Sequence, residues 1–177
     1  AAAIDRDALT VGKSTVPVGT ARRLAELVRT VRAEAGLPGE VELAWNPEFL
    51  REGFAVRDTL TPDRLVIGTH GPRAEGILRR VYARQLAADT PWISTDLETA
   101  ELVKVAANAF LATKISFINA FSEITENVGG DIGTLADAIG HDARIGRRFL
   151  NAGVGFGGGC LPKDIRCLLY TSDAADE

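Results

Sequence analysis

The sequence predicts an α/β protein in which a parallel sheet is followed by an all-α region built on one long helix. Up to residue 94, short β-branched segments alternate with helical repeats of apolar residues, an order typical of βαβ units. Beyond residue 94 the strand signals stop and a helical pattern runs on to about residue 128. We therefore predict the trailing part of a Rossmann-type sheet over residues 1–94 and a central helical domain over residues 95–166.

The first three elements have the order strand, helix, strand. Residues 9–18 are dense in β-branched side chains and predict a strand that a proline and a glycine end. Residues 21–35 follow as a helix, because apolar side chains recur there at i, i+3, i+4 and i+7. Residues 41–45 predict a second strand that ends at an Asn-Pro turn.

The rest of the sheet region is less regular. Residues 48–61 begin like a helix but meet Gly53 early, which predicts a short helical turn and an ordered loop. Residues 64–69 predict a third strand, residues 72–86 a helix, and residues 92–94 a last short strand. The residues of this helix expected to face inward are Ile77, Val81 and Leu86.

The helical region starts with a helix of unusual length. Thr95 or Asp96 can cap it, and it runs to about residue 128, which corresponds to roughly 45–50 Å. A helix that is apolar on most sides is normally buried against several neighbours or against a second subunit. Asp131 is expected to cap a second helix over residues 132–139, whose inward side chains are Leu135 and Ile139.

Composition excludes several classes of protein. Hydrophobic residues make up 46% of the chain and charged residues 25%, close to the globular average. The net charge is −4 without a dense basic block, so nucleic acid is not an expected partner. The most apolar segment, residues 102–124, carries three charged side chains within it, which indicates a buried helix and no membrane partner.

Cysteine and histidine usage argues against disulfide and metal sites. Cys160 and Cys167 are too few for a disulfide scaffold or a four-cysteine zinc site, and they fit a reducing cytoplasm. His70 and His141 have no cysteine or second histidine at ligand spacing, so we expect no metal.

The richest stretch for chemistry is the glycine run of residues 153–159, which leads into Cys160, Lys163 and Asp164. Glycine backbone can pass tightly around a ligand and aim its amides at an oxyanion. Lys163 would favour the thiolate form of Cys160, which is the form that attacks a carbonyl carbon. The alternative is that Cys160 is a small buried hydrophobic residue.

Three polar residues of the long helix share one stripe, because Glu101, Lys104 and Asn108 are spaced i, i+3, i+7. Burying an ammonium group among the apolar neighbours of Lys104 is costly unless a partner is near. One interpretation is that Lys104 pairs with Glu101 on a solvated face. The other is that Lys104 and Asn108 point into a pocket and stabilise negative charge on a substrate oxygen.

Other candidates are weaker when taken alone. Glu48 and Glu52 follow a strand end, where α/β sheets place ligands, and would share a face if their segment were helical; two surface glutamates are the alternative. Ser14 and Thr15 are equally typical of a turn. Arg144 belongs to a small basic cluster that meets phosphates or lies on a solvated surface.

One expected motif does not occur at the start of the sequence. No G-x-G-x-x-G lies between a strand and a helix there, although the pyrophosphate of a dinucleotide normally binds at such a turn. The chain also contains no methionine. We therefore expect an internal piece of a longer protein, without the usual apparatus for gripping NAD.

Four blocks together carry a resemblance to a known family. They are GKSTVPVGT (residues 12–20), NPEFLREG (46–53), ELVKVAANAF (101–110) and RIGRRFLNAGVGFGGGCLPKD (144–164). In order and separation this sequence resembles the UDP-glucose 6-dehydrogenases of the UDP-glucose/GDP-mannose dehydrogenase family over residues 8–167. Members of that family oxidise a sugar nucleotide twice at C6, from alcohol to acid, with two NAD reduced.

The resemblance implies a role for each matched residue. Cys160 would be the nucleophile that captures the aldehyde as a thiohemiacetal, which is oxidised to a thioester and hydrolysed. Lys104 and Asn108 would hold the C6 oxygen, and Glu48 would act in acid/base steps. Thr15 and Asp164 would position water. The remaining matched residues would contact NAD (Ser14, Glu52 and Lys163) or the sugar nucleotide (Phe149, Leu150, Asn151, Gly153, Gly155 and Gly157).

The resemblance also implies an assembly. Arg144 matches an arginine that reaches the partner subunit's substrate, and the long helix resembles the family's dimer core, so a homodimer is expected. Residues 1–94 would be the C-terminal part of the NAD-binding domain, and residues 95–166 the dimerisation and catalytic domain.

Two departures qualify the resemblance. The first βαβ half and the UDP-binding C-terminal domain of the family do not occur in the sequence, so we expect the chain alone to show little or no activity. Residues 167–177 match nothing expected there, and we predict a tail that is foreign to the fold. The alternatives are a GDP-mannose 6-dehydrogenase and a non-catalytic helical dimerisation module.

Overall fold

The computed structural model describes residues 4–157 and 159–169 of the chain. It has two compact units, which are described separately. The first holds the described residues up to Lys104, and the second is Val105–Leu169. The change from one unit to the other falls within the longest helix, α5 (Leu97–Val128).

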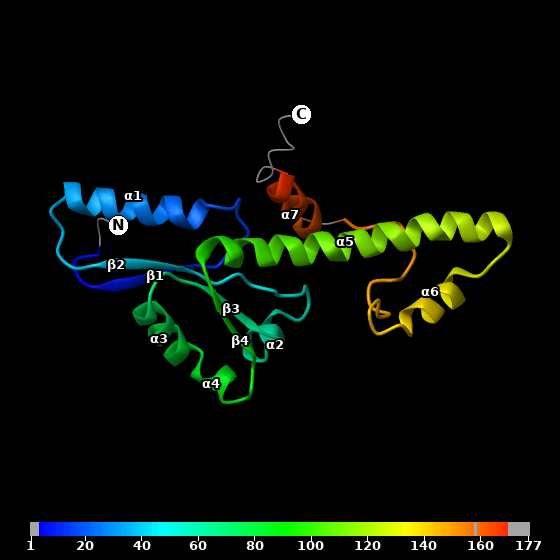
Figure 1. The fold of residues 1–177 in the computed structure, drawn as a ribbon, viewed down its shortest axis with the longest axis horizontal. Coiled ribbons are helices and arrows are strands. Elements are labelled where there is room, and N and C mark those ends of the chain that lie inside the picture. Colours follow the sequence, from blue (N-terminus) through cyan, green and yellow to red (C-terminus); the bar gives the residue numbers. More distant parts are fainter. Residues whose placement is uncertain (1–3, 158, 170–177) are drawn as a thin grey trace. The chain divides into compact units, whose positions relative to one another are not determined.

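The first unit contains a four-stranded sheet whose strands lie in chain order (Figure 1). The strands are β1 (Ala8–Gly12), β2 (Val41–Trp45), β3 (Leu65–Gly68) and β4 (Trp92–Thr95). Strand β1 is parallel to β2, and β3 is parallel to β4. The predicted α/β class is confirmed, with one correction to the wholly parallel sheet.

The correction concerns β2 and β3, which pair antiparallel through Trp45 and Gly68. Parallel neighbours need a crossover connection, usually a full helix. Between β2 and β3 the chain forms only the six-residue helix α2 (Ala55–Leu60), with loops on either side. Strand β3 therefore runs opposite to β2, and the sheet contains both parallel and antiparallel pairs.

The two faces of the sheet bury different side chains, because neighbouring residues of a strand point to opposite faces. On one face Trp45 and Val66 pack with Ala21 of α1 (Thr20–Glu34) and with Leu97 and Ala100 of α5. On the other face, buried side chains of β2, β3 and the following helix form a second cluster, namely Ala44, Ile67 and Leu78. Figure 1 shows α1 and this following helix, α3 (Pro72–Val81), on opposite sides of the sheet.

The helix predicted over residues 72–86 is two helices, α3 (Pro72–Val81) and α4 (Ala83–Leu86). They are separated at Tyr82, whose backbone leaves the helical region. The prediction that Val81 faces inward is wrong, since that residue is 66% exposed. The inward face instead runs through Ala74 and Leu78, four residues apart.

The second unit consists of the rest of α5, α6 (Ile132–Gly140) and α7 (Cys160–Leu169). Its core is formed by Ile118, Ala136 and Leu150, and the predicted inward residues Leu135 and Ile139 pack against it. Asp131 caps α6 as predicted, because its Oδ1 accepts the Thr134 N–H at 2.6 Å.

The long helix is also confirmed. The Oδ1 atom of Asp96 accepts the Thr99 N–H at 2.7 Å, so Asp96 caps its first turn. Within residues 4–157 and 159–169, no helix has both the length and the apolar character needed to cross a membrane. Helix α7 continues past Arg166 to Leu169, and the rest of the atypical tail, residues 170–177, lies outside the described residues.

Candidate functional site

In the first unit the predicted residues gather on the loops that follow β1 and β2. Residues 46–54, between β2 and α2, form no helix, so Glu48 and Glu52 do not share a helix face. The Oε2 atom of Glu48 accepts the N–H of Leu50 at 2.7 Å, which orients the carboxylate within its own loop. Glu52 is exposed on the same loop.

Lys104 is a buried cation of this unit. Its side chain is 9% exposed, and its Nζ lies 3.4 Å from Oε1 of Glu48 and 5.7 Å from the centre of the Phe49 ring. The interpretation that Lys104 pairs with Glu101 on a solvated face is wrong, because both residues are buried and the ion pair is with Glu48. A buried ammonium needs such a partner, because moving an unpaired charge out of water costs on the order of several kcal/mol.

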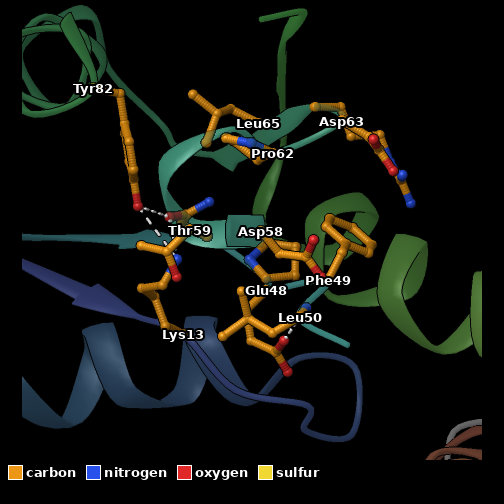
Figure 2. Close-up of a pocket in the computed structure, with 13 residues that line it drawn as sticks. Lys13, Glu48, Phe49, Leu50, Asp58, Thr59, Pro62, Asp63, Leu65 and Tyr82 are labelled. Carbon is orange, nitrogen blue, oxygen red and sulfur yellow. Dashed lines mark hydrogen bonds between the residues drawn. The ribbon is translucent and has the colours of Figure 1, made fainter. Parts of the chain in front are cut away.

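A pocket of about 130 Å³ opens beside this ion pair. It is lined by Lys13 after β1, by residues 46–50 after β2, by α2 and the loop that follows it, and by Tyr82 (Figure 2). Asn46 ties this wall together: its Oδ1 accepts hydrogen bonds from Lys13 Nζ at 2.9 Å and from the Tyr82 hydroxyl, and its Nδ2 donates to the Val66 carbonyl at 2.9 Å. Asn46 does not stand out in the sequence as a site residue, because an Asn-Pro pair is typical of a turn.

A second ion pair, between Arg51 and Asp58, attaches the loop of residues 46–54 to α2. Arg51 contacts Asp58 of α2 three times, through its backbone N–H, its Nε and its guanidinium Nη2. These hydrogen bonds lower the pKa of Asp58 to about 2, and those from the Arg51 side chain contribute more than the one from its backbone N–H. The loop that carries Glu48 and Glu52 is therefore fixed at both ends.

Ser14 and Thr15 lie in the loop between β1 and α1. Ser14 is exposed and Thr15 is half-buried. The carbonyl of Ser14 accepts a hydrogen bond from the indole Nε1 of Trp45 at 3.2 Å, so the β1 loop is attached to the end of β2. Both residues thus stand at the carboxyl end of a parallel strand, where α/β sheets bind ligands.

In the second unit two predicted residues contact a third, Asp164, which is fully buried. Its Oδ2 accepts a hydrogen bond from Nδ2 of Asn108 on α5 at 2.5 Å, and its Oδ1 lies 3.0 Å from Nζ of Lys163. Cys160 is the first residue of α7 and is exposed. Residues four apart share a helix face, so Cys160 and Asp164 lie on the same side of α7.

Lys163 interacts electrostatically with Cys160, as the sequence suggested, but its direct partner is Asp164. Burial alone lowers the pKa of Lys163, but its hydrogen bond and charge attraction to Asp164 outweigh that effect and the pKa is raised. Lys163 therefore stays positive and is paired with Asp164 in the structure. The interpretation of Cys160 as a buried hydrophobic residue is wrong, since its side chain is accessible.

The glycine loop begins beside the core of the second unit. Leu150 is buried in that core, so only its backbone can face a ligand, whereas Phe149 and Asn151 are exposed. The N–H of Gly153 donates to Oδ1 of Asn119 at 2.9 Å, which attaches the loop to α5. Gly155 and Gly157 are exposed.

Arg144 is exposed and pairs with Asp142 at 2.6 Å in this chain. To reach a partner subunit's substrate it would have to leave that carboxylate. Among residues 4–157 and 159–169, no cluster of three or more His, Cys, Asp or Glu side chains is placed to hold a metal ion.

Comparison with known families matches both halves of the chain. Residues 1–86 match the NAD binding domain of the UDP-glucose/GDP-mannose dehydrogenase family, and residues 98–177 match the central domain of the same family. Among curated proteins, a UDP-glucose 6-dehydrogenase of Bacillus subtilis is 48% identical over 165 residues, and one of Rickettsia felis is 47% identical over 165 residues. These matches cover 93% of this chain but only 34% and 36% of the relatives, so the chain spans about a third of their length.

Solved structures agree with this match. A UDP-glucose dehydrogenase from the archaeon Pyrobaculum islandicum superposes with a TM-score of 0.86 at 44% identity, over 97% of this chain and 38% of that one. A GDP-mannose dehydrogenase from Pseudomonas aeruginosa gives 0.68 at 32% identity, over 97% of this chain and 39% of that one. The motifs, the fold and these relatives together show that the chain belongs to the UDP-glucose/GDP-mannose dehydrogenase family.

Proposed function

We propose that the chain is the part of an NAD-dependent UDP-glucose 6-dehydrogenase that carries the catalytic cysteine. The reaction is the twofold oxidation of UDP-glucose to UDP-glucuronate. The observation that carries the proposal is the arrangement in the second unit, where Asn108 binds the buried Asp164 one turn along α7 from the exposed Cys160. An accessible thiol on a helix that is anchored by a buried carboxylate is suited to covalent capture of an aldehyde.

The thiol chemistry follows from the first oxidation, in which C6 loses a hydride and the hydroxyl loses a proton to give an aldehyde. The Cys160 sulfur then adds to the carbonyl carbon, and the carbonyl oxygen takes a proton to form a thiohemiacetal. Loss of a second hydride from C6 and of the hydroxyl proton converts it to a thioester. Water then breaks the C–S bond, releasing the carboxylate and restoring the thiol.

The polar residues that match the family's catalytic positions have separate tasks in this proposal. Lys104 and Asn108 donate to the C6 oxygen and stabilise the negative charge that grows on it. Glu48, already oriented by the Leu50 N–H, exchanges protons with the substrate or with water. Thr15 and Asp164 position the water that hydrolyses the thioester.

The residues that match cofactor positions fit NAD. Ser14 and Glu52 are exposed at the carboxyl ends of β1 and β2, where a carboxylate and a hydroxyl can bind the hydroxyl groups of a ribose. Lys163 keeps its positive charge beside Asp164 and is the third residue that would hold the cofactor. When bound, NAD supplies the acceptor for each hydride.

UDP-glucose is proposed as the substrate because the relatives named for it are the more similar ones. Identity is 48% and 44% for two such proteins, against 32% for the GDP-mannose dehydrogenase. The exposed loop from Phe149 to Gly157 would cradle the sugar nucleotide through its backbone. The free thiol that this chemistry needs is kept reduced in the cytoplasm, where we place the enzyme.

We also propose a homodimer formed through α5. Phe110, Phe117 and Ile124 follow one another at intervals of seven residues and are all exposed in the isolated chain. Apolar residues at this spacing form the stripe with which helices pair. A second copy of the chain, with Arg144 directed toward its sugar-nucleotide site, is the proposed occupant of this face.

The test places residues 8–169 of this chain in the Bacillus subtilis relative, in place of the matching third of that enzyme. The hybrid should make UDP-glucuronate from UDP-glucose and NAD, and Cys160→Ser should abolish that product because a hydroxyl does not replace the thiolate as nucleophile. Cys167→Ser, on the same helix, is the matched control and should stay active. Normal acid formation by the Cys160→Ser hybrid would contradict the proposal.

A further inference from the structure

Glu101 connects α5 with the start of α1 in the first unit. Its two carboxylate oxygens accept backbone N–H groups at 2.7 Å each, Oε2 from Gly19 and Oε1 from Ala21. The residue is only 2% exposed. The first N–H groups of a helix have no partner within that helix, so they bind a group from elsewhere in the fold.

Helix α1 depends on this distant carboxylate because its own sequence provides no cap. The N-cap residue is Gly19, which has no side chain and has a left-handed φ of 85°, and the first turn contains no acidic residue. Glu101 therefore replaces the usual Ser, Thr, Asp or Asn and meets the positive end of the helix dipole. It also fills the place where a helix N-terminus would otherwise attract a phosphate.

Burying the carboxylate of Glu101 costs free energy, so its oxygens need their hydrogen bonds. Burial raises the pKa of Glu101, and the hydrogen bonds from Ala21 and Gly19 oppose this effect. Of the neighbouring charges, Glu98 raises the pKa further and Arg23 lowers it. A carboxylate in this setting tolerates little displacement, since each lost N–H leaves a buried charge less satisfied.

Lys104 follows Glu101 by three residues on the same helix, so the two side chains project from neighbouring positions of one face. Any rotation or slide of the first turns of α5 that moves Glu101 from the N–H groups of α1 also moves Lys104. The Lys104 ammonium pairs with Glu48 at 3.4 Å and lies near the ring of Phe49. Neither contact by itself fixes the position of the ammonium along the loop of residues 46–54.

We propose that Glu101 is a positioning residue for the reaction, which sets the rotation and height of α5 so that Lys104 stands at Glu48. Glu101 touches neither substrate nor cofactor in this role. The importance of the placement for catalysis rests on the function proposed above, whereas the placement itself can be tested without any turnover.

The first experiment measures the acylation of individual lysines in the chain by an amine-reactive reagent, with peptides quantified by mass spectrometry. Lys104 is nearly buried and should react far more slowly than the exposed Lys13, which serves as the internal reference. In Glu101→Gln the amide NH2 faces an N–H donor, so one hydrogen bond is lost and α5 is released. Labelling of Lys104 should rise on the order of tenfold, as expected for a weakened local structure.

The matched control is Glu98→Gln. Glu98 also joins α5 to α1, through an ion pair with Arg22 at 2.8 Å near the surface. Removing this pair should leave the labelling of Lys104 unchanged, because the carboxylate of Glu101 stays in place. If Glu101→Gln does not fold by circular dichroism, Glu101→Asp is used instead, since it keeps the charge but is one methylene too short to reach both N–H groups.

The second experiment uses the hybrid enzyme. Glu101→Gln should lower kcat with little change in KM for UDP-glucose, while Glu98→Gln should match the parent. An active Lys104→Ala hybrid would contradict the catalytic role of Lys104, yet the labelling result would still decide the role of Glu101. A folded Glu101 variant in which Lys104 stays protected from labelling would overturn the positioning role. Failure of both variants to fold would also overturn it, because Glu101 would then be required for folding alone.

Discussion

The lowered pKa of Asp58 makes the stability of the loop of residues 46–54 depend on pH. Its carboxylate takes three hydrogen bonds from Arg51, and these hold the loop that begins at Asn46 against α2. In the unfolded chain the carboxyl has its ordinary pKa near 3.8, and in the folded chain the pKa is about 2. A group whose pKa is lowered by folding stabilises the folded state above the unfolded pKa, and this contribution is lost as pH falls through the folded pKa.

We therefore predict that the free energy of unfolding of the first unit decreases as pH is lowered from about 4 to about 2. Denaturant titrations followed by tryptophan fluorescence report on this unit, because Trp45 and Trp92 both lie in it. In Asp58→Asn the decrease should be smaller and stability at neutral pH lower, the rest of the decrease coming from Asp96 and Glu75, whose pKa values hydrogen bonds also lower.

The control for this prediction is Glu26→Gln, a change of an exposed carboxyl on α1. Its pH dependence should match that of the parent chain. An Asp58→Asn variant with an unchanged slope between pH 4 and 2 would show that the bonds with Arg51 do not stabilise the loop.

At the scale of the elements, the caps of the helices are local in two cases and distant in one. Asp96 and Asp131 each bind an N–H three residues later, the ordinary pattern for an N-cap. The start of α1 is capped by Glu101, which lies 80 residues further along the chain than Ala21. Removing a local cap should therefore weaken one helix, whereas removing Glu101 should loosen two.

For the local cap we predict that Asp131→Ala destabilises the second unit by about 0.5–2 kcal/mol, because the Thr134 N–H loses its acceptor. Thermal unfolding followed by circular dichroism should show a midpoint several degrees lower, at roughly 4–8 °C per kcal/mol for a unit of this size. Asp131→Asn keeps an acceptor oxygen and should recover most of the loss. Equal destabilisation by alanine and asparagine would argue against capping as the cause.

The close approach of elements also depends on glycine. A Cβ on Gly68 would lie 2.7 Å from the Cβ of Ala100 and 2.7 Å from the Asp96 carbonyl oxygen. The end of β3 and the first turn of α5 can thus pack in direct backbone contact only because position 68 has no side chain. This contact holds the first turn of α5 against the end of β3, one residue before Glu101.

At the scale of the whole molecule, the exposed apolar stripe of α5 is the strongest sign of an assembly. Phe110, Phe117 and Ile124 stay in water in a single chain, although each would be buried in a helix pair. We predict that the hybrid enzyme is a dimer by light scattering after size-exclusion chromatography, and that Phe117→Glu yields monomers because it places a charge in the stripe.

The control for the dimer is Ser116→Glu, a change at an exposed position about 100° away around the helix from Phe117. It should leave the dimer intact. A Phe117→Glu hybrid that elutes and scatters as a dimer would show that another surface holds the subunits together.

Most of the helices and strands could be predicted from the sequence, because they follow from local periodicity. The long helix, the Asp131 cap and the strands that begin at residues 8, 41 and 65 follow from patterns within a few residues. The first strand nevertheless ends at Gly12 and not at residue 18, and the choice of Asp96 over Thr95 as the cap of α5 needed the structure. The family followed from four motif blocks for the same reason, since spacing and residue type are local properties. The break at Tyr82 and the exposure of Val81 did not follow, because the inward face of α3 depends on where the sheet lies.

The partners of the charged residues could not be predicted from the sequence, because they come from distant segments of the chain. Periodicity placed Glu101 and Lys104 on one stripe and suggested that they pair, yet each binds a segment from another part of the chain, Glu101 the start of α1 and Lys104 the loop after β2. The antiparallel pairing of β2 with β3 was likewise invisible in the sequence. A buried charge pairs with the donor or acceptor that the fold brings close to it, and long-range packing decides which group that is.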